Sequence, residues 1–317
     1  MRKVEFRGYL YILIGSTLWG VSSVVAKSLF NIGIPPVELV LVRLILSTLT
    51  LLSFLLLFSP KRLFVSAKDL PYFLTLGLIG VAGMQYAYYF TISKIQVAPA
   101  ILLQYLSLIW VSIYSYLFQK EPFSKRKIAS LLMALFGCYL VVGGYQINLL
   151  RLNKIGIISG LIGSFFFSFY MLFGEKGLKK YDSWTLLLYG FGFAAFLFSI
   201  FISPIKVLKE GHSVQVWLAF IYISIFSTLI PFGLYLKGVD CIRATRASIT
   251  ATWEPVMAGM MAYFVLGEVL SSIQVMGGFG VIVAIVMLQM AREKSAPPPP
   301  LEIRQSSSLP DYLKDKV

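Results

Sequence analysis

The chain has 317 residues, of which 58% are hydrophobic and only 13% are charged, and its formal net charge is +14. Its mean hydropathy is +0.80. A soluble domain carries about 25% charged residues, and so large an apolar surplus cannot be buried inside a water-soluble globule of this size. The composition therefore nearly excludes a soluble enzyme or a nucleic-acid-binding protein.

Apolar runs long enough to cross a bilayer follow one another along most of the chain. A spanning helix needs about 20 mostly apolar residues, and the separators between these runs are short and carry turn residues or charge. The sequence therefore predicts an all-α integral membrane protein with ten transmembrane helices. These are expected near residues 8–30, 36–58, 70–92, 97–118, 128–146, 155–174, 183–204, 214–236, 245–266 and 270–291.

The basic residues are distributed unequally between the two sides of the predicted membrane. If the N-terminus is cytoplasmic, most of the Lys and Arg residues fall in the inner loops, while the outer loops hold only Lys94, Arg151, Lys154, Lys206 and Lys209. Cytoplasmic loops are enriched in Lys and Arg. We therefore expect a multi-pass protein of the cell (cytoplasmic) membrane with both termini in the cytoplasm, and the net charge is explained by topology.

The end of the chain differs in composition from the rest. After Arg292 it becomes rich in proline and serine and loses its apolar period, as in Pro297–Pro300. Such segments do not bury enough apolar surface to fold. Residues 295–317 are predicted to be a disordered cytoplasmic tail.

The two halves of the apolar region show an internal repeat. A shift of 147 residues places Tyr88 on Tyr235, Ala100 on Ala247 and Glu121 on Glu268. Each predicted unit, 8–146 and 155–291, holds five helices, so the second unit must enter the membrane upside down relative to the first. Inverted repeats of this kind are typical of transporters, with the binding site at the repeat interface near the bilayer midplane.

The motifs in these units resemble a known family. Tyr235, Ala247, Trp253-Glu254-Pro255, Gly267-Glu268 and Gln274 with Gly277 are similar to the end of an EamA domain. Trp19-Gly20, Lys27 and Arg43 are similar to the start of that domain. The chain thus resembles EamA-like transporters of the drug/metabolite transporter superfamily. The resemblance implies a ten-helix bundle of two inverted repeats that moves small metabolites, amino acids or drugs. The first copy departs from the second at Ser107-Leu108, where the second has Glu254-Pro255.

Glu254 is the most informative charge within the predicted spans. It lies about ten residues into its helix, or roughly 15 Å at 1.5 Å per residue, close to the midplane. Pro255 follows it and favours a kink. An acid beside a broken helix is expected at a substrate or proton site. Pairing with an arginine or a helix terminus is the structural alternative, and the sequence leaves both open.

Two basic residues also fall within spans. Arg43 can pair with Glu254, hold a substrate carboxylate or extend toward the headgroups. Lys27 lies nearer the outer edge, where its stem is expected to reach the headgroups.

Polar side chains at helical spacing predict a central cavity, because such faces avoid lipid. Packing between helices is the alternative for several of them. The candidate cavity residues are Trp19, Ser22, Ser23, Arg43, Gln85, Tyr88, Gln104, Tyr170, Ser227, Tyr235, Thr250 and Glu254.

No enzyme signature is present. The sequence contains no Walker loop, no HExxH motif and no cluster of metal ligands. Its only histidine, His212, lies in a polar loop, and its two cysteines imply neither a disulfide framework nor a metal site. No catalytic residue, cofactor or metal is predicted.

The sequence favours a secondary transporter that exports small metabolites such as amino acids by alternating access, with Glu254 as the candidate for the coupling ion. The alternatives are an importer or exchanger of sugar or nucleotide-sugar substrates, or a membrane channel. The expected partners are a small-molecule substrate, the lipid bilayer, and protons or another coupling ion. No nucleic-acid partner is expected, and the chain is either a monomer or a homodimer.

Overall fold

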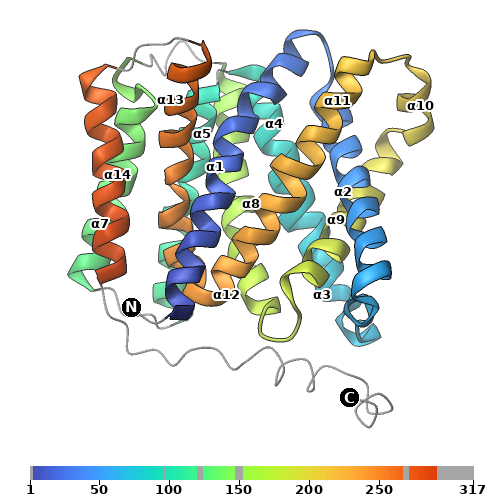
Figure 1. Ribbon diagram of the computed structural model, residues 1–317, viewed down its shortest axis with the longest axis horizontal. Coiled ribbons are helices and arrows are strands. Elements are labelled where there is room, and N and C mark those ends of the chain that lie inside the picture. Colours follow the sequence, from blue (N-terminus) through green and yellow to red (C-terminus); the bar gives the residue numbers. More distant parts are fainter. Residues whose placement is uncertain (1–2, 96, 120–123, 147–152, 267–270, 291–317) are drawn as a thin grey trace.

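The computed structural model describes residues 3–95, 97–119, 124–146, 153–266 and 271–290. Within them all regular structure is helical, and Figure 1 shows a single bundle whose long helices run between two faces. We call the face at Lys3, where the first helix begins, the lower face, and the face at Asn31, where it ends, the upper face. The predicted tail and both Glu121 and Glu268 lie outside the described residues.

The first half of the chain forms an ordered series of helices, in which α3, η3 and α4 make one continuous rod. The elements are α1 (Lys3–Asn31), α2 (Pro36–Phe58), η1 (Pro60–Leu63), η2 (Ala67–Asp69), α3 (Leu70–Thr75), the π-helix η3 (Leu76–Gly83), α4 (Met84–Lys94), α5 (Val97–Tyr105), α6 (Ser107–Leu117), α7 (Lys125–Val141) and η4 (Gly144–Gln146).

The second half follows a similar order, and α11, η6 and the part of α12 before Arg243 again form one rod. The elements are α8 (Lys154–Gly177), α9 (Ser183–Phe201), α10 (Pro204–Lys209), α11 (Val214–Tyr222), the π-helix η6 (Ile223–Leu229), α12 (Ile230–Ala251), α13 (Trp253–Leu266) and α14 (Ser272–Met290).

Short polar residues fix where several helices begin. Asn153 accepts hydrogen bonds from the backbone N–H groups of Ile155 and Gly156 at the start of α8. Asp182, Ser213 and Ser124 cap α9, α11 and α7 in the same way. These caps satisfy backbone donors that the first turn of a helix leaves free.

The surface of the bundle is apolar, as expected for a membrane protein. Large side chains such as Leu57, Phe58, Phe196 and Phe201 are mostly exposed, whereas Arg43 is buried. Among the described residues, seven helical segments are long and apolar enough to cross a membrane, and Ser272–Leu288 forms a shorter apolar helix. The chain is therefore an all-helical, multi-pass membrane protein. The spanning segments are Val4–Asn31, Pro36–Phe58, Ala67–Lys94, Pro99–Leu117, Lys154–Gly177, Ser183–Phe201 and Val214–Ala251.

The predicted count of ten spans is not confirmed. The break expected between the spans 214–236 and 245–266 is present as a kink, because two helices meet at Arg243, where the backbone is not helical. The charges in that stretch, which suggested a loop, lie on a helix interrupted at Arg243, whose φ is 70° and ψ 159°. The helix ends at Thr252, inside the predicted span 245–266, and α7 has only 17 residues.

The helices of the two halves pack in corresponding ways. α1 packs against α12 and α13, and α8 packs against α4, α5 and α6; α2 faces α9, and α7 faces α14. Figure 1 shows the α7–α14 pair at one edge of the bundle. The π-helices η3 and η6 begin at Leu76 and Ile223, 147 residues apart.

Polar contacts join two loops at the lower face. Lys180 and Tyr181 both donate hydrogen bonds to Asp69, and Arg62 pairs with Asp182 at 3.0 Å. Burial and the hydrogen bond to Asp69 hold the pKa of Tyr181 above its usual range. The segment after α2 is thus tied to the segment before α9.

Candidate functional site

A small cavity of about 40 Å³ lies among helices from both halves of the chain. Ligand pockets usually measure about 300–1,000 Å³, so this one has room for water but not for a metabolite in the present conformation. Its lining residues are Trp19, Arg43, Met84, Gln85, Tyr88, Tyr89, Gln104, Phe167, Ser227, Phe232 and Glu254.

The cavity brings together more than half of the residues that the sequence nominated. These residues come from α1, α2, α4, α5, η6 and α13. They are Trp19, Arg43, Gln85, Tyr88, Gln104, Ser227 and Glu254.

Glu254 lies where two interrupted helices meet. It is 7% exposed and belongs to the first turn of α13, which begins just after the break at Thr252. The hydroxyl of Tyr105, the last residue of α5 before its own break, donates to Glu254 Oε2 at 2.9 Å and also contacts the Ala251 carbonyl. Pro255 falls in that first turn, where its missing N–H costs no hydrogen bond. The break therefore precedes Glu254, and the proline begins the new helix.

Arg43 is anchored inside the bundle and does not extend toward the headgroups. It is 2% exposed, its Nε donates to Thr228 Oγ1 at 2.8 Å, and its Nη2 lies 3.4 Å from the Ser227 carbonyl. The guanidinium carbon stands 4.6 Å from the centre of the Tyr89 ring. A cation over an aromatic face is stabilised there.

The π-helix η6 supplies the carbonyl that organises this contact. Ser227 O accepts from Arg43 and from Trp19 Nε1, the latter at 3.2 Å. Thr228 donates back to Ile223, five residues earlier. A π-turn displaces the usual hydrogen bonds of a helix and is frequent at functional sites.

Arg43 and Glu254 do not neutralise each other. Both line the cavity, but the described structure contains no ion pair between them. The cavity thus presents one cationic and one anionic group at separate positions.

Two cavity amides keep polar atoms without protein partners. Gln85 is 3% exposed and its Nε2 has no hydrogen-bond partner, and Gln104 Oε1 likewise has none. An unsatisfied buried polar atom costs about 1–3 kcal/mol. A polar solute or water entering the cavity would satisfy these atoms.

The remaining nominated residues stand apart from the cavity lining. Ser22 and Thr250 donate to carbonyls of their own helices, at Leu18 and Arg246. Tyr170 and Tyr235 are buried, and each hydroxyl lacks a partner. Ser23 belongs to α1, but its side chain lies outside the described part of the structure.

The aromatic residues form a wall behind the cavity. Trp19 lies 4.9 Å from Phe232 and 5.5 Å from Tyr235, and Tyr170 lies 5.6 Å from Phe232, all between ring centroids. Tyr170 and Tyr235 thus support the lining residues from outside.

Several contributors were not predicted. Tyr89, Tyr105 and Thr228 bind Arg43 or Glu254, and Met84, Phe167 and Phe232 complete the lining. One sequence feature could have drawn attention to Tyr105. The internal repeat aligns it with Thr252, where α12 ends before α13 begins.

Lys27 also differs from expectation. Its Nζ donates to the carbonyls of Ile92 at 2.7 Å and Ile95 at 3.2 Å. It therefore satisfies carbonyls at the end of α4, which lack partners in the helix itself.

A larger cavity of about 960 Å³ opens between α6, α8 and α12. At its polar end Arg243 contacts Glu175 Oε1 at 3.2 Å and Gln119 Oε1 at 2.8 Å, while Gln119 donates to Glu175 at 3.1 Å. None of the nominated site residues lines this cavity.

Comparisons with known proteins agree with this architecture. An uncharacterized inner membrane transporter of Salmonella typhimurium, YicL, is 24% identical over 297 residues, spanning 92% of this chain and 97% of its own. An uncharacterized transporter of Archaeoglobus fulgidus is 27% identical over 287 residues, spanning 88% of this chain and 95% of its own. The threonine/homoserine exporter RhtA of Escherichia coli is 26% identical over 267 residues, spanning 83% of this chain and 84% of its own.

A solved structure described as the crystal structure of a protein has the same fold, with a TM-score of 0.71 over 90% of this chain and 98% of its own. At 15% identity it shows the fold alone. The profile of the EamA-like transporter family matches residues 6–143 and again residues 154–290, nearly all of the described helices. The chain belongs to the EamA-like transporter family.

Proposed function

We propose that this transporter exports small metabolites such as amino acids by alternating access through the cavity between Arg43 and Glu254. The observation that carries this proposal is the presence of two opposite, unpaired charges in one buried cavity. An amino acid zwitterion matches them, with its carboxylate toward Arg43 and its ammonium toward Glu254. RhtA, named a threonine/homoserine exporter, is a relative at 26% identity and favours this substrate class.

The proposed mechanism gives the cavity residues distinct tasks. The free amide atoms of Gln85 and Gln104 bind the polar groups of the solute. Glu254 takes up the ammonium group or a coupling proton, and Tyr105 orients its carboxylate. Buried charges at this depth are costly without function or pairing.

The proposed architecture is ten spans in two inverted five-helix repeats, residues 8–146 and 155–291. The separate family matches, the matched π-helices and the corresponding helix contacts support it. If α8 corresponds to α1, then α4 and α5–α6 correspond to α12 and α13. The contacts of α1 with α12 and α13 therefore correspond to the contacts of α8 with α4, α5 and α6. Such correspondence is expected when the two repeats exchange roles during transport.

The central prediction concerns Glu254→Gln. We expect net efflux of an amino acid such as threonine from proteoliposomes to fall about tenfold, since one charge-assisted contact is worth about 1.4 kcal/mol or more. Glu5→Gln removes a carboxylate from the lower end of α1 and should transport like wild type. Equal efflux and equal pH response in wild type and Glu254→Gln would refute the assigned role.

The competing functions receive less support from the cavity. Sugar phosphates and nucleotide sugars are anionic, and Arg43 is the single basic residue among the described lining residues. A channel would conduct continuously and give unitary currents. Counterflow of a labelled amino acid without such currents would favour the transporter.

The proposed orientation places the lower face and both termini in the cytoplasm, following the excess of basic residues in that face's loops. It can be tested with single cysteines in a background that lacks Cys138 and Cys241. Ser66→Cys lies in a lower-face loop, and Ser213→Cys lies in the upper loop before α11. A membrane-impermeant maleimide added to intact cells should label Ser213→Cys and spare Ser66→Cys. The reverse pattern would invert the topology.

A further inference from the structure

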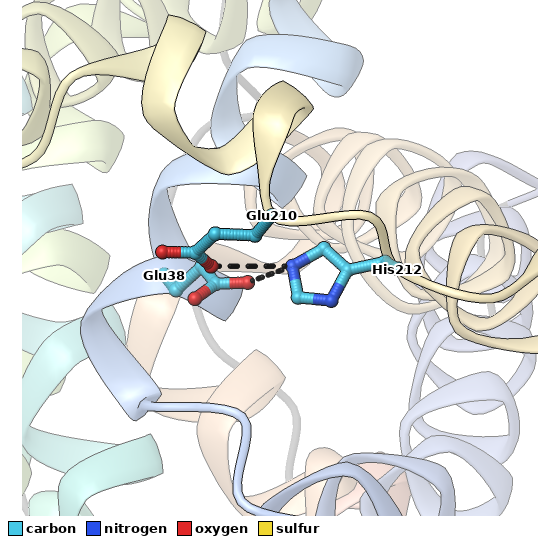
Figure 2. A group of neighbouring side chains, drawn as sticks. All are labelled: Glu38, Glu210 and His212. Atoms are coloured by element: carbon cyan, nitrogen blue, oxygen red, sulfur yellow. Dashed lines mark ion pairs between the residues drawn. The ribbon is translucent and has the colours of Figure 1, made fainter.

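Three potential metal ligands converge at the upper face, outside the lining of the central cavity. Glu38 lies in the first turn of α2, while Glu210 and His212 belong to the loop between α10 and α11. Figure 2 shows both carboxylates directed at the same imidazole nitrogen. His212 Nε2 lies 2.7 Å from Glu38 Oε1 and 3.5 Å from Glu210 Oε2, and the ligand atoms all fall within 4.8 Å of one another.

One hydrogen bond cannot account for this arrangement of three side chains. Glu38 is 4% exposed, and its Oε1 forms an ion pair with His212 Nε2 at 2.7 Å that lacks the geometry of a well-aligned hydrogen bond. A single imidazole nitrogen also has only one proton or one lone pair for two carboxylates. Among the described residues, therefore, no single donor serves both carboxylates at this nitrogen.

The electrostatic balance favours a dication at that position. With a neutral imidazole, the buried Glu38 carboxylate and the more exposed Glu210 carboxylate place two negative charges side by side. Lys206 lies 3.9 Å from Glu210 Oε1 and is itself mostly exposed, so it offsets this charge only weakly. Buried charges are retained when they are paired or coordinate a metal.

The geometry points to a binding site for a first-row divalent cation such as Zn²⁺, held by Glu38, Glu210 and His212. Zinc binds imidazole nitrogen and carboxylate oxygen at about 2.0–2.2 Å, which these ligand atoms reach with small side-chain adjustments. A histidine ligand disfavours Mg²⁺ and Ca²⁺, which prefer oxygen. The sequence predicts no metal site here, because Glu38 is distant in the chain from the other two ligands.

The surrounding packing fixes the histidine. The His212 ring makes edge contacts with Phe220 at 5.8 Å and Trp217 at 6.3 Å between centroids, both on α11. Glu210 is the most exposed ligand, with 36% of its side chain accessible, so a cation enters from the upper face. Bound there, it ties α2 to the segment that leads through α11 into η6. Arg43 also joins α2 to η6, through its hydrogen bond to Thr228.

The site can be tested on full-length, tag-free protein in detergent, because His212 is the only histidine in the chain. After chelator treatment, Zn²⁺ and, separately, Mg²⁺ are added and binding is followed by isothermal titration calorimetry. We expect one equivalent of Zn²⁺ to bind, with Mg²⁺ at least about tenfold weaker. His212→Gln and Glu210→Gln should each weaken Zn²⁺ binding by at least about tenfold.

Matched controls separate this site from other ligands. Cys241→Ser removes a partly accessible thiol, and Glu5→Gln removes a carboxylate at the opposite face; both should bind Zn²⁺ like wild type. Glu210→Gln changes an exposed side chain and keeps the test valid if His212→Gln folds poorly.

A residue-specific readout completes the experiment. In protein labelled with ¹⁵N only at histidine, Zn²⁺ should shift the signals of the single imidazole, and Glu210→Gln should raise the Zn²⁺ concentration required. No Zn²⁺ binding, equal binding in the ligand variants, or an imidazolium signal unchanged by Zn²⁺ would overturn the proposal in favour of a protonated His212 paired with two carboxylates.

Discussion

Replacing Arg43 with alanine should both destabilise the protein and reduce transport about 100-fold. Arg43 donates to Thr228 and Ser227 and lies over Tyr89, so its loss breaks two contacts between α2 and η6 and one with α4. Hydrogen bonds from charged groups contribute about 1.5–3 kcal/mol each. We expect the free energy of unfolding to fall by about 3 kcal/mol, measured as a lower melting temperature in detergent.

A second substitution separates the structural effect from the binding effect. Arg43→Lys keeps the positive charge but loses the planar fork that can bind a carboxylate at two points. We expect Arg43→Lys to recover much of the melting temperature and little of the efflux. If Arg43→Lys transports like wild type, or if Arg43→Ala does so at any temperature where it is folded, Arg43 does not bind the substrate carboxylate.

The second large effect is expected from Gly20→Ala on α1. A Cβ at Gly20 would lie 2.7 Å from the Glu254 carbonyl oxygen and 3.0 Å from the Ala258 backbone nitrogen. Neither backbone atom can rotate away as a side chain could. The added methyl therefore must push α13 away from α1 and carry Glu254 with it. Overpacking of this kind costs about 1–3 kcal/mol.

For Gly20→Ala we expect a lower melting temperature together with an efflux loss comparable to that of Glu254→Gln. Gly192→Ala is the matched control, because its nearest neighbour would be the Thr48 methyl at an ordinary 3.7 Å. Gly192→Ala should be neutral or slightly stabilising. Equal melting temperatures and equal transport for Gly20→Ala and wild type would show that α1 and α13 are not held at this distance.

Much of the architecture could be predicted from the apolar periodicity, because a membrane protein must keep a nonpolar face toward lipid. The starts of α2, α8 and α9 fell within a few residues of expectation, since Pro36, Asn153 and Asp182 mark them. A break between the spans 214–236 and 245–266 was expected from charged residues such as Lys237 and Arg243, and the chain does kink at Arg243. The connection is tighter than the expected loop, because helical structure resumes directly after Arg243.

The π-helices could not be predicted at all. Leu76–Gly83 and Ile223–Leu229 contain no residue that demands a wider turn, so the conformation depends on tertiary packing. Their spacing becomes meaningful only once both are seen in the structure.

The candidate site was predictable where polarity contrasted with its surroundings. Gln85, Gln104 and Glu254 stand out in apolar runs, and all three line the cavity. Tyr89 and Tyr105 did not stand out, because tyrosine is common in this chain and serves packing elsewhere. Glu38 and His212 meet through the fold alone, and no spacing rule connects residues so far apart.

The backbone at Arg243 has a consequence for how the bundle changes shape. Its φ of 70° and ψ of 159° fall in a region that is essentially restricted to glycine and costs an arginine about 1–3 kcal/mol. The contacts with Glu175 and Gln119 hold that conformation in place, so side chains on α8 and near α6 act as a latch on the backbone of α12. Loss of the contacts with Glu175 and Gln119 would let the strained backbone at Arg243 relax. A molecule that binds Glu175 from the adjoining 960 Å³ cavity would therefore remove one of these contacts and change the angle of α12 at Arg243.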